Sequence, residues 1–258
     1  MRITITNRKQ QRMIVIVDEV MPQHGLAFVM HGLGGNKDQA HIKVIAEAFV
    51  THGYTTVRFD TTNTFGESDG AYENATTTNY YEDLEDAIAW AKGQPWYREP
   101  FTLAGHSLGG ICTALYAERH PEEVLALAPI ATVVSGKLSC ETNKEQVNEW
   151  RRTGWREETS HSHPERVKRL PWSHMEDRLR YDLLPSAYRL TMPVLMIVGD
   201  RDMSTPPAHQ QLLIDAIPGN RKELHIIPGS SHNFLEAVHL QGLHEALTNW
   251  LENLPTSS

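Results

Sequence analysis

The residues Gly105-His106-Ser107-Leu108-Gly109-Gly110 form a G-x-S-x-G motif between a short apolar run, 101–104, and a stretch with helical periodicity, 111–119. A serine on so sharp a strand-to-helix turn holds its hydroxyl exposed above the sheet. The backbone there is crowded, so glycine is expected two residues before and two residues after the serine. The alternative is an ordinary glycine-rich turn, and partners elsewhere in the chain decide between the two.

Short apolar runs alternate with helical periodicity along most of the chain, and this alternation predicts the fold class. We expect strands at 2–6, 12–18, 26–30, 55–59, 101–104, 124–130, 193–198 and 223–227, and helices at 37–52, 80–91, 111–119 and 234–251. The first two strands form a hairpin around 7–11. The remainder predicts an α/β protein with a mostly parallel, doubly wound sheet. In such a sheet, ligands bind at the carboxyl ends of the strands.

The segment 131–190 interrupts this alternation, because it shows no clear strand and is rich in Arg, Glu, His and Trp. It is longer than an ordinary connection and has the length of a small helical insertion. We therefore expect a core made of 1–130 and 191–258, with 131–190 inserted into it.

A serine hydroxyl needs a base within hydrogen-bond reach, and the base needs a third group that orients it. His232 follows the strand 223–227 in a Gly-Ser-Ser turn and is the expected base. Asp200 and Asp202 both follow the strand 193–198, and the spacing favours Asp202 as the acid. Asp200 is the alternative, and whichever aspartate is not the acid is expected to bond local backbone amides. Thr205, before a proline, is expected to cap the next helix.

Acyl transfer places negative charge on the carbonyl oxygen, and fixed N–H donors must meet it. One expected donor is the backbone N–H of Leu108, directly after the serine. The other is the N–H of Leu33, in the loop His31-Gly32-Leu33-Gly34-Gly35 after the strand 26–30. The alternative interpretation of that loop is a glycine turn that precedes a helix and has no role in catalysis.

These motifs together resemble the α/β-hydrolase superfamily, in the chain order Ser, Asp, His. The residues that carry the resemblance are His31 to Gly35, Arg58-Phe59-Asp60, Gly66 to Gly70, Gly105 to Gly110, Gly199-x-x-Asp202 and Gly229-Ser-Ser-His232. The chain is similar to the branch of serine esterases, monoglyceride-lipase-like hydrolases and serine aminopeptidases. The stretch 57–70, with Asp83, Glu85 and Asp86, most resembles bacterial cinnamoyl/feruloyl esterases.

The sequence departs from that of the relatives in one stretch and at one further position. The stretch Asn63 to Ser68 stands where many have Arg-Gly-His-Gly-x-Ser, and Leu108 stands where cinnamoyl esterases often have Gln. The resemblance implies the α/β-hydrolase fold, with 131–190 forming a small helical cap over the site. Trp155, Trp172 and Met175 are candidate substrate-binding residues of that cap, because pockets are mostly apolar and aromatic. Each could equally fasten the cap to the core.

The function expected is hydrolysis of carboxylic esters with small or aromatic acyl groups, by Ser107, Asp202 and His232 through an acyl-enzyme. A serine aminopeptidase, amidase or thioesterase with the same three residues is the enzymatic alternative. Glu157, Glu158 and Glu176 are available to bind a free amino group. A ligand-binding receptor that has lost catalysis is the alternative of another class.

The expected partner is a small-molecule ester substrate, and the composition favours no larger one. The 258 residues carry a net charge of −8 without a long basic run, which disfavours nucleic acid and anionic membranes. We expect no membrane span and, from an N-terminus without an apolar signal region, a cytoplasmic location. No metal or cofactor is expected: Cys112 and Cys140 lack metal or redox spacing, and His161, His163 and His174 fit a polar loop better than a metal site. The sequence carries no signal for an oligomeric state.

Overall fold

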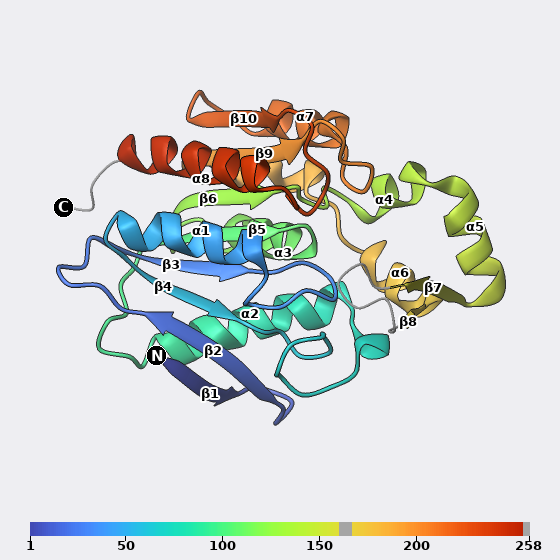
Figure 1. Ribbon diagram of the computed structural model, residues 1–258, viewed down its shortest axis with the longest axis horizontal. Helices are drawn as coiled ribbons and strands as arrows, with labels where there is room; N and C mark the ends of the chain where they lie inside the picture. Colours follow the sequence, from blue (N-terminus) through green and yellow to red (C-terminus); the bar gives the residue numbers. More distant parts are fainter. Residues whose placement is uncertain (160–166, 255–258) are drawn as a thin grey trace.

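The computed structural model describes residues 1–159 and 167–254, and it confirms the expected α/β architecture (Figure 1). One eight-stranded sheet has the order β1-β2-β4-β3-β5-β6-β9-β10. Its strands are β1 (Arg2–Thr6), β2 (Arg12–Asp18), β3 (Gly25–Met30), β4 (Tyr54–Phe59), β5 (Phe101–His106), β6 (Val124–Ile130), β9 (Val194–Gly199) and β10 (Lys222–Ile227). The pairs β1–β2 and β2–β4 are antiparallel, and the other five pairs are parallel.

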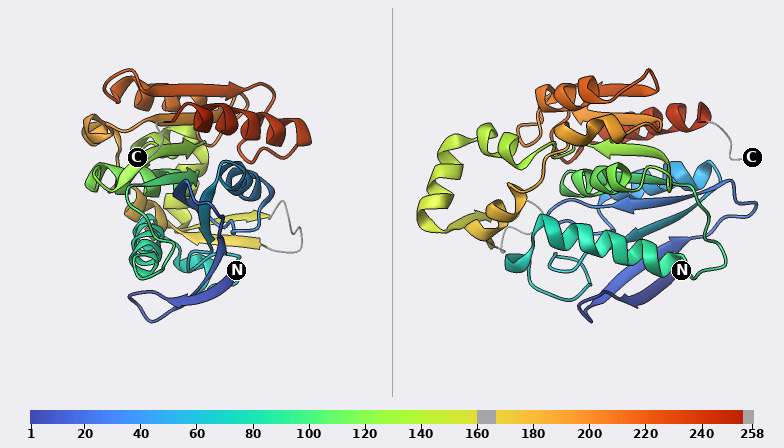
Figure 2. Two further views of the ribbon diagram at one scale, coloured as in Figure 1. Left: turned by 90° about the vertical axis from the view of Figure 1, so that its left-hand side faces the viewer. Right: turned by 180° about the vertical axis from the view of Figure 1, so that it is seen from behind.

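Helices cover both faces of this sheet (Figure 2). The main helices are α1 (Ala40–Thr51), α2 (Thr77–Ala91), α3 (Leu108–Arg119), α7 (Pro207–Ala216) and α8 (Ala237–Glu252). One apolar cluster joins the sheet to α2, α3 and α7, and a second joins it to α1 and α8. Every residue of β3, β5 and β9 is buried, which explains why these strands are continuous apolar runs in the sequence.

Two helices begin later than their periodicity predicts. The helix expected from residue 37 begins at Ala40, because Gln39 has a ψ of 145°, outside the helical region, and the N–H of Lys37 is held by Asp60 Oδ1 at 2.7 Å. The helix expected from residue 234 begins at Ala237, because Phe234 has a φ of 51°, outside the right-handed helical region. No helix in the two described stretches has the length and apolar character that crossing a membrane requires.

The segment 131–190 is not purely helical, so the expectation that it holds no strand is wrong. It contains α4 (Gly136–Thr142), α5 (Lys144–Thr153), β7 (Trp155–Thr159), β8 (Val167–Pro171), α6 (Trp172–Arg178) and the 3-10 turn η2 (Leu184–Arg189). The strands β7 and β8 form an antiparallel pair of their own, with an ion pair between Glu157 and Arg169 at 2.9 Å. Their charged residues hide the strand pattern. Figure 1 shows α5, β7, β8 and α6 together beyond one end of the main sheet.

A buried carboxyl group in α3 gives the fold a testable pH dependence. Glu118 is 4% exposed, its Oε1 has no hydrogen-bond partner among the described residues, and burial raises its pKa to about 8. The folded protein therefore keeps this group protonated in a range where the unfolded chain ionises it.

We expect the stability that Glu118 contributes to be complete below pH 4.5 and to be lost as the pH rises toward 8. Glu118→Gln should therefore gain about 2 to 4 kcal/mol relative to the wild type between these pH values. Urea unfolding at both pH values measures this, with Glu122→Gln at the exposed neighbouring turn as control. The same difference between variant and wild type at both pH values would contradict the prediction.

Candidate active site

Ser107 occupies the sharp turn between β5 and α3, in a backbone conformation that side chains rarely adopt. Its φ is 57° and its ψ is −113°. A Cβ atom on Gly109 would lie 2.5 Å from the carbonyl oxygen of His31, and one on Gly105 would collide with the carbonyl of Gly109. The crowding that the motif predicts is therefore present, and it fixes the position of the serine hydroxyl.

His232 links Ser107 to Asp202 through two hydrogen bonds. The Oγ of Ser107 lies 2.9 Å from His232 Nε2, and His232 Nδ1 lies 2.7 Å from Asp202 Oδ2. Asp202 is 1% exposed, and its Oδ1 accepts the backbone N–H groups of Ser204 and Thr205, both at 2.8 Å. Burial opposes ionisation, but the bonds and charge of His232 and the donors of Thr205 lower the pKa of Asp202 overall. The site thus holds an ionised carboxylate against the imidazole.

Two smaller expectations about the loop after β9 are wrong. Asp202 bonds the local amides, whereas Asp200 Oδ1 accepts the N–H of Gly229 at 2.7 Å and so ties the loop after β9 to the loop that carries His232. Thr205 does not cap α7, whose N-cap residue is Pro206. The Thr205 hydroxyl instead lies 2.8 Å from both Asp202 Oδ2 and the carbonyl oxygen of Ala131.

The loop after β3 lies directly against the serine. A Cβ atom on Gly32 would be 2.9 Å from the Cβ of Ser107, so only glycine allows this approach. Within the described stretches, the N–H of Leu33 has no hydrogen-bond partner. Leu108 is buried at the first position of α3. Both expected oxyanion donors therefore belong to elements that meet at Ser107.

Two buried side chains, Tyr80 and His31, fix this loop, and the sequence patterns did not single out the first of them. The Tyr80 hydroxyl accepts the N–H of Gly34 at 3.1 Å. His31 Nδ1 lies 2.7 Å from the carbonyl oxygen of Gly32, and its Nε2 accepts the N–H of Thr61 at 3.1 Å. Tyr80 stood only as the start of an expected helix in the sequence, and its hydroxyl is found only when α2 is placed beside the loop.

His106 holds the backbone of His232 in place. Its Nε2 lies 2.9 Å from the carbonyl oxygen of His232, and its ring packs 4.3 Å from that of His41. Burial lowers the pKa of His106 well below its ordinary value and that of His41 to about 3. A neutral His106 therefore donates its Nε2–H to the His232 carbonyl, in the variable position of the motif where sequence alone assigns no role.

The three candidate substrate-binding residues lie in different surroundings. Met175 is 2% exposed and packs with Trp150 and Leu170 in a cluster that also contacts Leu33. Trp172 packs edge-on against Trp150 and lines a hollow of about 370 Å³ whose lining does not include Ser107. Trp155 is 38% exposed, with the guanidinium of Arg169 4.5 Å from its ring centroid. Met175 thus belongs to the cluster that contacts the oxyanion loop, together with Trp150, which sequence reasoning missed, and Trp172 packs against the same cluster.

The acidic candidates do not converge. Glu157 pairs with Arg169, Glu158 hydrogen-bonds Arg156 at 2.7 Å, and Glu176 lines the hollow beside Trp172. Two of the three are therefore engaged with arginines.

Of the histidines at 161, 163 and 174, only His174 lies among the described residues. His174 is buried and its Nδ1 lies 2.7 Å from the carbonyl oxygen of Ala75. His161 and His163 lie outside the described residues.

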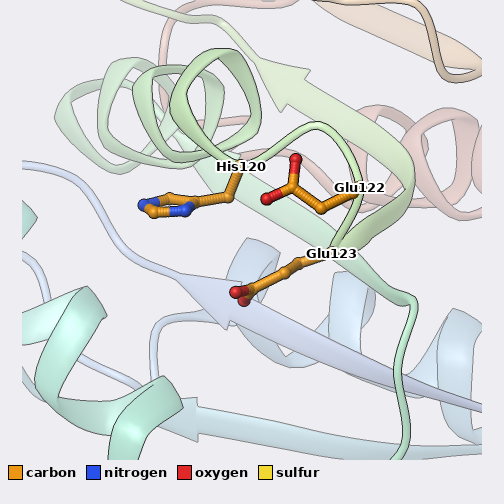
Figure 3. A group of neighbouring side chains, drawn as sticks. All are labelled: His120, Glu122 and Glu123. Atoms are coloured by element: carbon orange, nitrogen blue, oxygen red, sulfur yellow. The ribbon is translucent and has the colours of Figure 1, made fainter.

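A separate group of potential metal ligands lies after the opposite end of α3 from Ser107. His120, Glu122 and Glu123 bring ligand atoms within 4.8 Å of one another (Figure 3). Glu123 already accepts hydrogen bonds from the Tyr116 hydroxyl at 2.6 Å and from Lys92 at 3.1 Å. This group is exposed or half-buried and takes no part in the site around Ser107.

Two family models match the chain. A model described as X-Pro dipeptidyl-peptidase (S15 family) matches residues 30–183, more than half of the chain. A model described as serine aminopeptidase, S33, matches residues 152–237. The first match includes Ser107, and the second includes Asp202 and His232.

Individual proteins also resemble this chain, at low sequence identity. A 31.7 kDa protein of the traX-finO intergenic region of Escherichia coli is 24% identical over 96% of this chain and 98% of its own. The palmitoyl-protein thioesterase ABHD10, mitochondrial, of Bos taurus is 26% identical over 90% of this chain and 74% of its own. The structure of Est1E from Butyrivibrio proteoclasticus with bound ferulic acid superposes with a TM-score of 0.81 at 20% identity and covers 98% of both chains. The last likeness confirms the α/β-hydrolase fold.

Replacing each aspartate of the loop after β9 separates their roles. Asp202→Asn should lower kcat for ester hydrolysis by about 10⁴, because an amide cannot hold His232 in the tautomer that accepts the serine proton. Asp200→Asn keeps an oxygen for the Gly229 N–H and should change kcat by much less. Steady-state kinetics on a p-nitrophenyl ester, with circular dichroism as a folding control, compares them. A larger loss in Asp200→Asn would assign the acid to Asp200.

Proposed function

We propose that this chain, which belongs to the X-Pro dipeptidyl-peptidase (S15) family of serine hydrolases, hydrolyses carboxylic esters through an acyl-enzyme formed on Ser107. The observation that carries the proposal is the continuous hydrogen-bond chain from Ser107 Oγ through His232 to Asp202, at 2.9 and 2.7 Å. Such a chain serves to remove the serine proton as the nucleophile attacks.

In the proposed acylation step, His232 Nε2 accepts the Ser107 proton while Oγ attacks the ester carbonyl. Asp202 remains ionised and stabilises the imidazolium. The N–H groups of Leu33 and Leu108 stabilise the oxyanion, aided by the positive end of α3. His232 then gives its proton to the departing alcohol, leaving the acyl group on Ser107.

Deacylation repeats these roles with water. His232 removes a proton from water, the hydroxide attacks the acyl-enzyme, and the proton returns to Ser107 as the acid leaves. Each step uses the residues described, and none requires a metal or an organic cofactor.

Esters with small or aromatic acyl groups are the favoured substrates within this proposal. Two observations support esters over peptides: Glu157 and Glu158 are engaged with arginines, and the acidic candidates form no common site for a free amino group. The similarity of 57–70 to feruloyl esterases supports an aromatic acyl group. We further propose that 131–190 acts as the cap that bounds the substrate and that the protein works in the cytoplasm, as its sequence predicts.

A thioester is the second candidate substrate, favoured by the likeness to a protein described as a palmitoyl-protein thioesterase. A thiolate leaves without the protonation that an alkoxide or amine requires, so the same residues can cleave it. Rates for matched p-nitrophenyl esters, acyl thioesters and aminoacyl anilides rank the three bond types directly. A preference for the anilides would instead identify an aminopeptidase.

Removing the nucleophile tests the central proposal. Ser107→Ala should reduce hydrolysis of p-nitrophenyl butyrate by about 10⁶, since no other group can form the acyl-enzyme. It should also abolish labelling by a fluorophosphonate probe. The exposed Ser173→Ala is the matched control and should keep both properties. Undiminished hydrolysis in Ser107→Ala would refute the mechanism, and folded wild type that neither hydrolyses nor labels would support the ligand-receptor alternative.

A further inference from the structure

Arg178, in the last turn of α6, is a half-buried cation without a counterion in the described stretches. Its Nη2 lies 2.8 Å from His174 Nε2, whereas its Nε is sealed from solvent and has no partner. It takes part in none of the ion pairs that the described residues form. A partly buried charge with no opposite charge beside it, and with one N–H sealed from water and lacking an acceptor, is unfavourable, so proteins rarely keep one without use.

His174 cannot supply the missing charge. Its Nδ1–H donates to the carbonyl oxygen of Ala75, so its Nε2 accepts from Arg178 as a neutral imidazole. Burial and the nearby Arg178 lower the pKa of His174 well below its ordinary value, which keeps the ring uncharged. His174 therefore orients the guanidinium and leaves its charge unmet.

The neighbouring carboxylate of Asp177 is committed elsewhere. It accepts the N–H and the hydroxyl of Thr78, at 2.9 and 2.5 Å, and pairs with Arg180 at 3.2 Å. These contacts fasten α6 to the start of α2. The residue beside Arg178 thus anchors the segment 131–190 and does not neutralise Arg178.

The surroundings of Arg178 lead to the oxyanion loop. Trp150 stacks on His174 with ring centroids 6.1 Å apart, and it belongs to the buried cluster that contacts Leu33 and Tyr72. A Cβ atom on Gly34 would lie 2.7 Å from the Tyr72 ring, so Tyr72 covers the oxyanion loop. Burial raises the pKa of Tyr72, and the positive charges of Arg156 and Arg178 partly oppose this rise. Arg156, 5.4 Å from the Trp150 ring, is paired with Glu158.

We propose that Arg178 binds a negatively charged group of the substrate, so that the preferred esters carry a carboxylate in addition to the bond that is cleaved. The inference rests on the proposed ester hydrolysis and adds the substrate class. A carboxylate suits a guanidinium because its two oxygens accept parallel N–H donors. The bound anion would provide the counterion that the described residues lack, next to aromatic rings that would contact the rest of the substrate.

Matched ester pairs test this inference. Mono-p-nitrophenyl adipate and its neutral methyl ester place the charge on the acyl side; 4-carboxyphenyl hexanoate and its methyl ester place it on the leaving group. We expect the wild type to prefer the anionic member of one pair, which tells where the charge binds. In Arg178→Met, the ratio of kcat/KM for the anionic over the neutral ester should fall by about 10- to 100-fold, the size of a hydrogen bond to a charged group.

Two further variants distinguish binding from packing. Arg178→Lys keeps the charge and should retain part of the preference. Arg180→Met removes an exposed cation two residues further along the chain. It should leave the ratio as in the wild type. Equal rates for both members of both pairs in the wild type, or an unchanged ratio in Arg178→Met, would overturn the proposal.

A binding measurement separates this inference from the proposed hydrolysis. Adipate should raise the melting temperature of Ser107→Ala, and the double variant with Arg178→Met should lose that shift. An adipate shift that depends on Arg178 in a protein that cleaves no ester would refute the hydrolysis and keep the anion site. Ester cleavage without an adipate shift and without an anionic preference would refute the anion site and keep the proposed hydrolysis.

Discussion

The backbone at Ser107 is the constraint on which the rest of the site depends. A non-glycine residue with a φ of 57° costs on the order of 1–3 kcal/mol and persists only where the surroundings enforce it. Here the enforcement comes from close backbone approaches at Gly32, Gly105 and Gly109, which lock β3, β5 and α3 together. The same contacts that hold the serine outward bring the loop of Leu33 against it. Nucleophile and oxyanion loop are therefore two results of one packing arrangement.

The sheet and the chain order of the site could be predicted because their signals are local. Continuous apolar runs reveal buried central strands such as β3 and β9, and parallel strands place Ser107, Asp202 and His232 at one edge. The details that failed depend on contacts distant in sequence. Asp200 reaches Gly229, and Thr205 turns toward Ala131 instead of capping its own helix. Neither partner is visible in the residues that flank them.

The segment 131–190 was the least predictable part, for a physical reason. The strands β7 and β8 are stabilised by pairs such as Glu157–Arg169, so their sequence shows charge where a strand pattern is expected to show apolar alternation. Aromatic composition alone could not separate Trp150, buried beside the oxyanion loop, from Trp155 at the surface. Arg178 illustrates the same limit, because the absence of a counterion among the described residues becomes apparent only once their side chains are placed.

The two ends of this segment are held by the sheet itself. The N–H of Ala131 donates to the carbonyl oxygen of Ile197 at 2.6 Å, its own carbonyl is held by Thr205, and the chain returns through β9 beside β6. Asp202 and His232 lie in the loops that follow β9 and β10, after the return point, and Asp200 joins these two loops through the N–H of Gly229. The hydrogen-bond chain of Ser107, His232 and Asp202 is therefore made by residues outside 131–190, and the segment meets it only at its first residue, where the Ala131 carbonyl holds Thr205. For the cap proposed above, this arrangement implies that exchange of one continuous segment beyond Ala131 changes which substrates fit and leaves that hydrogen-bond chain in place.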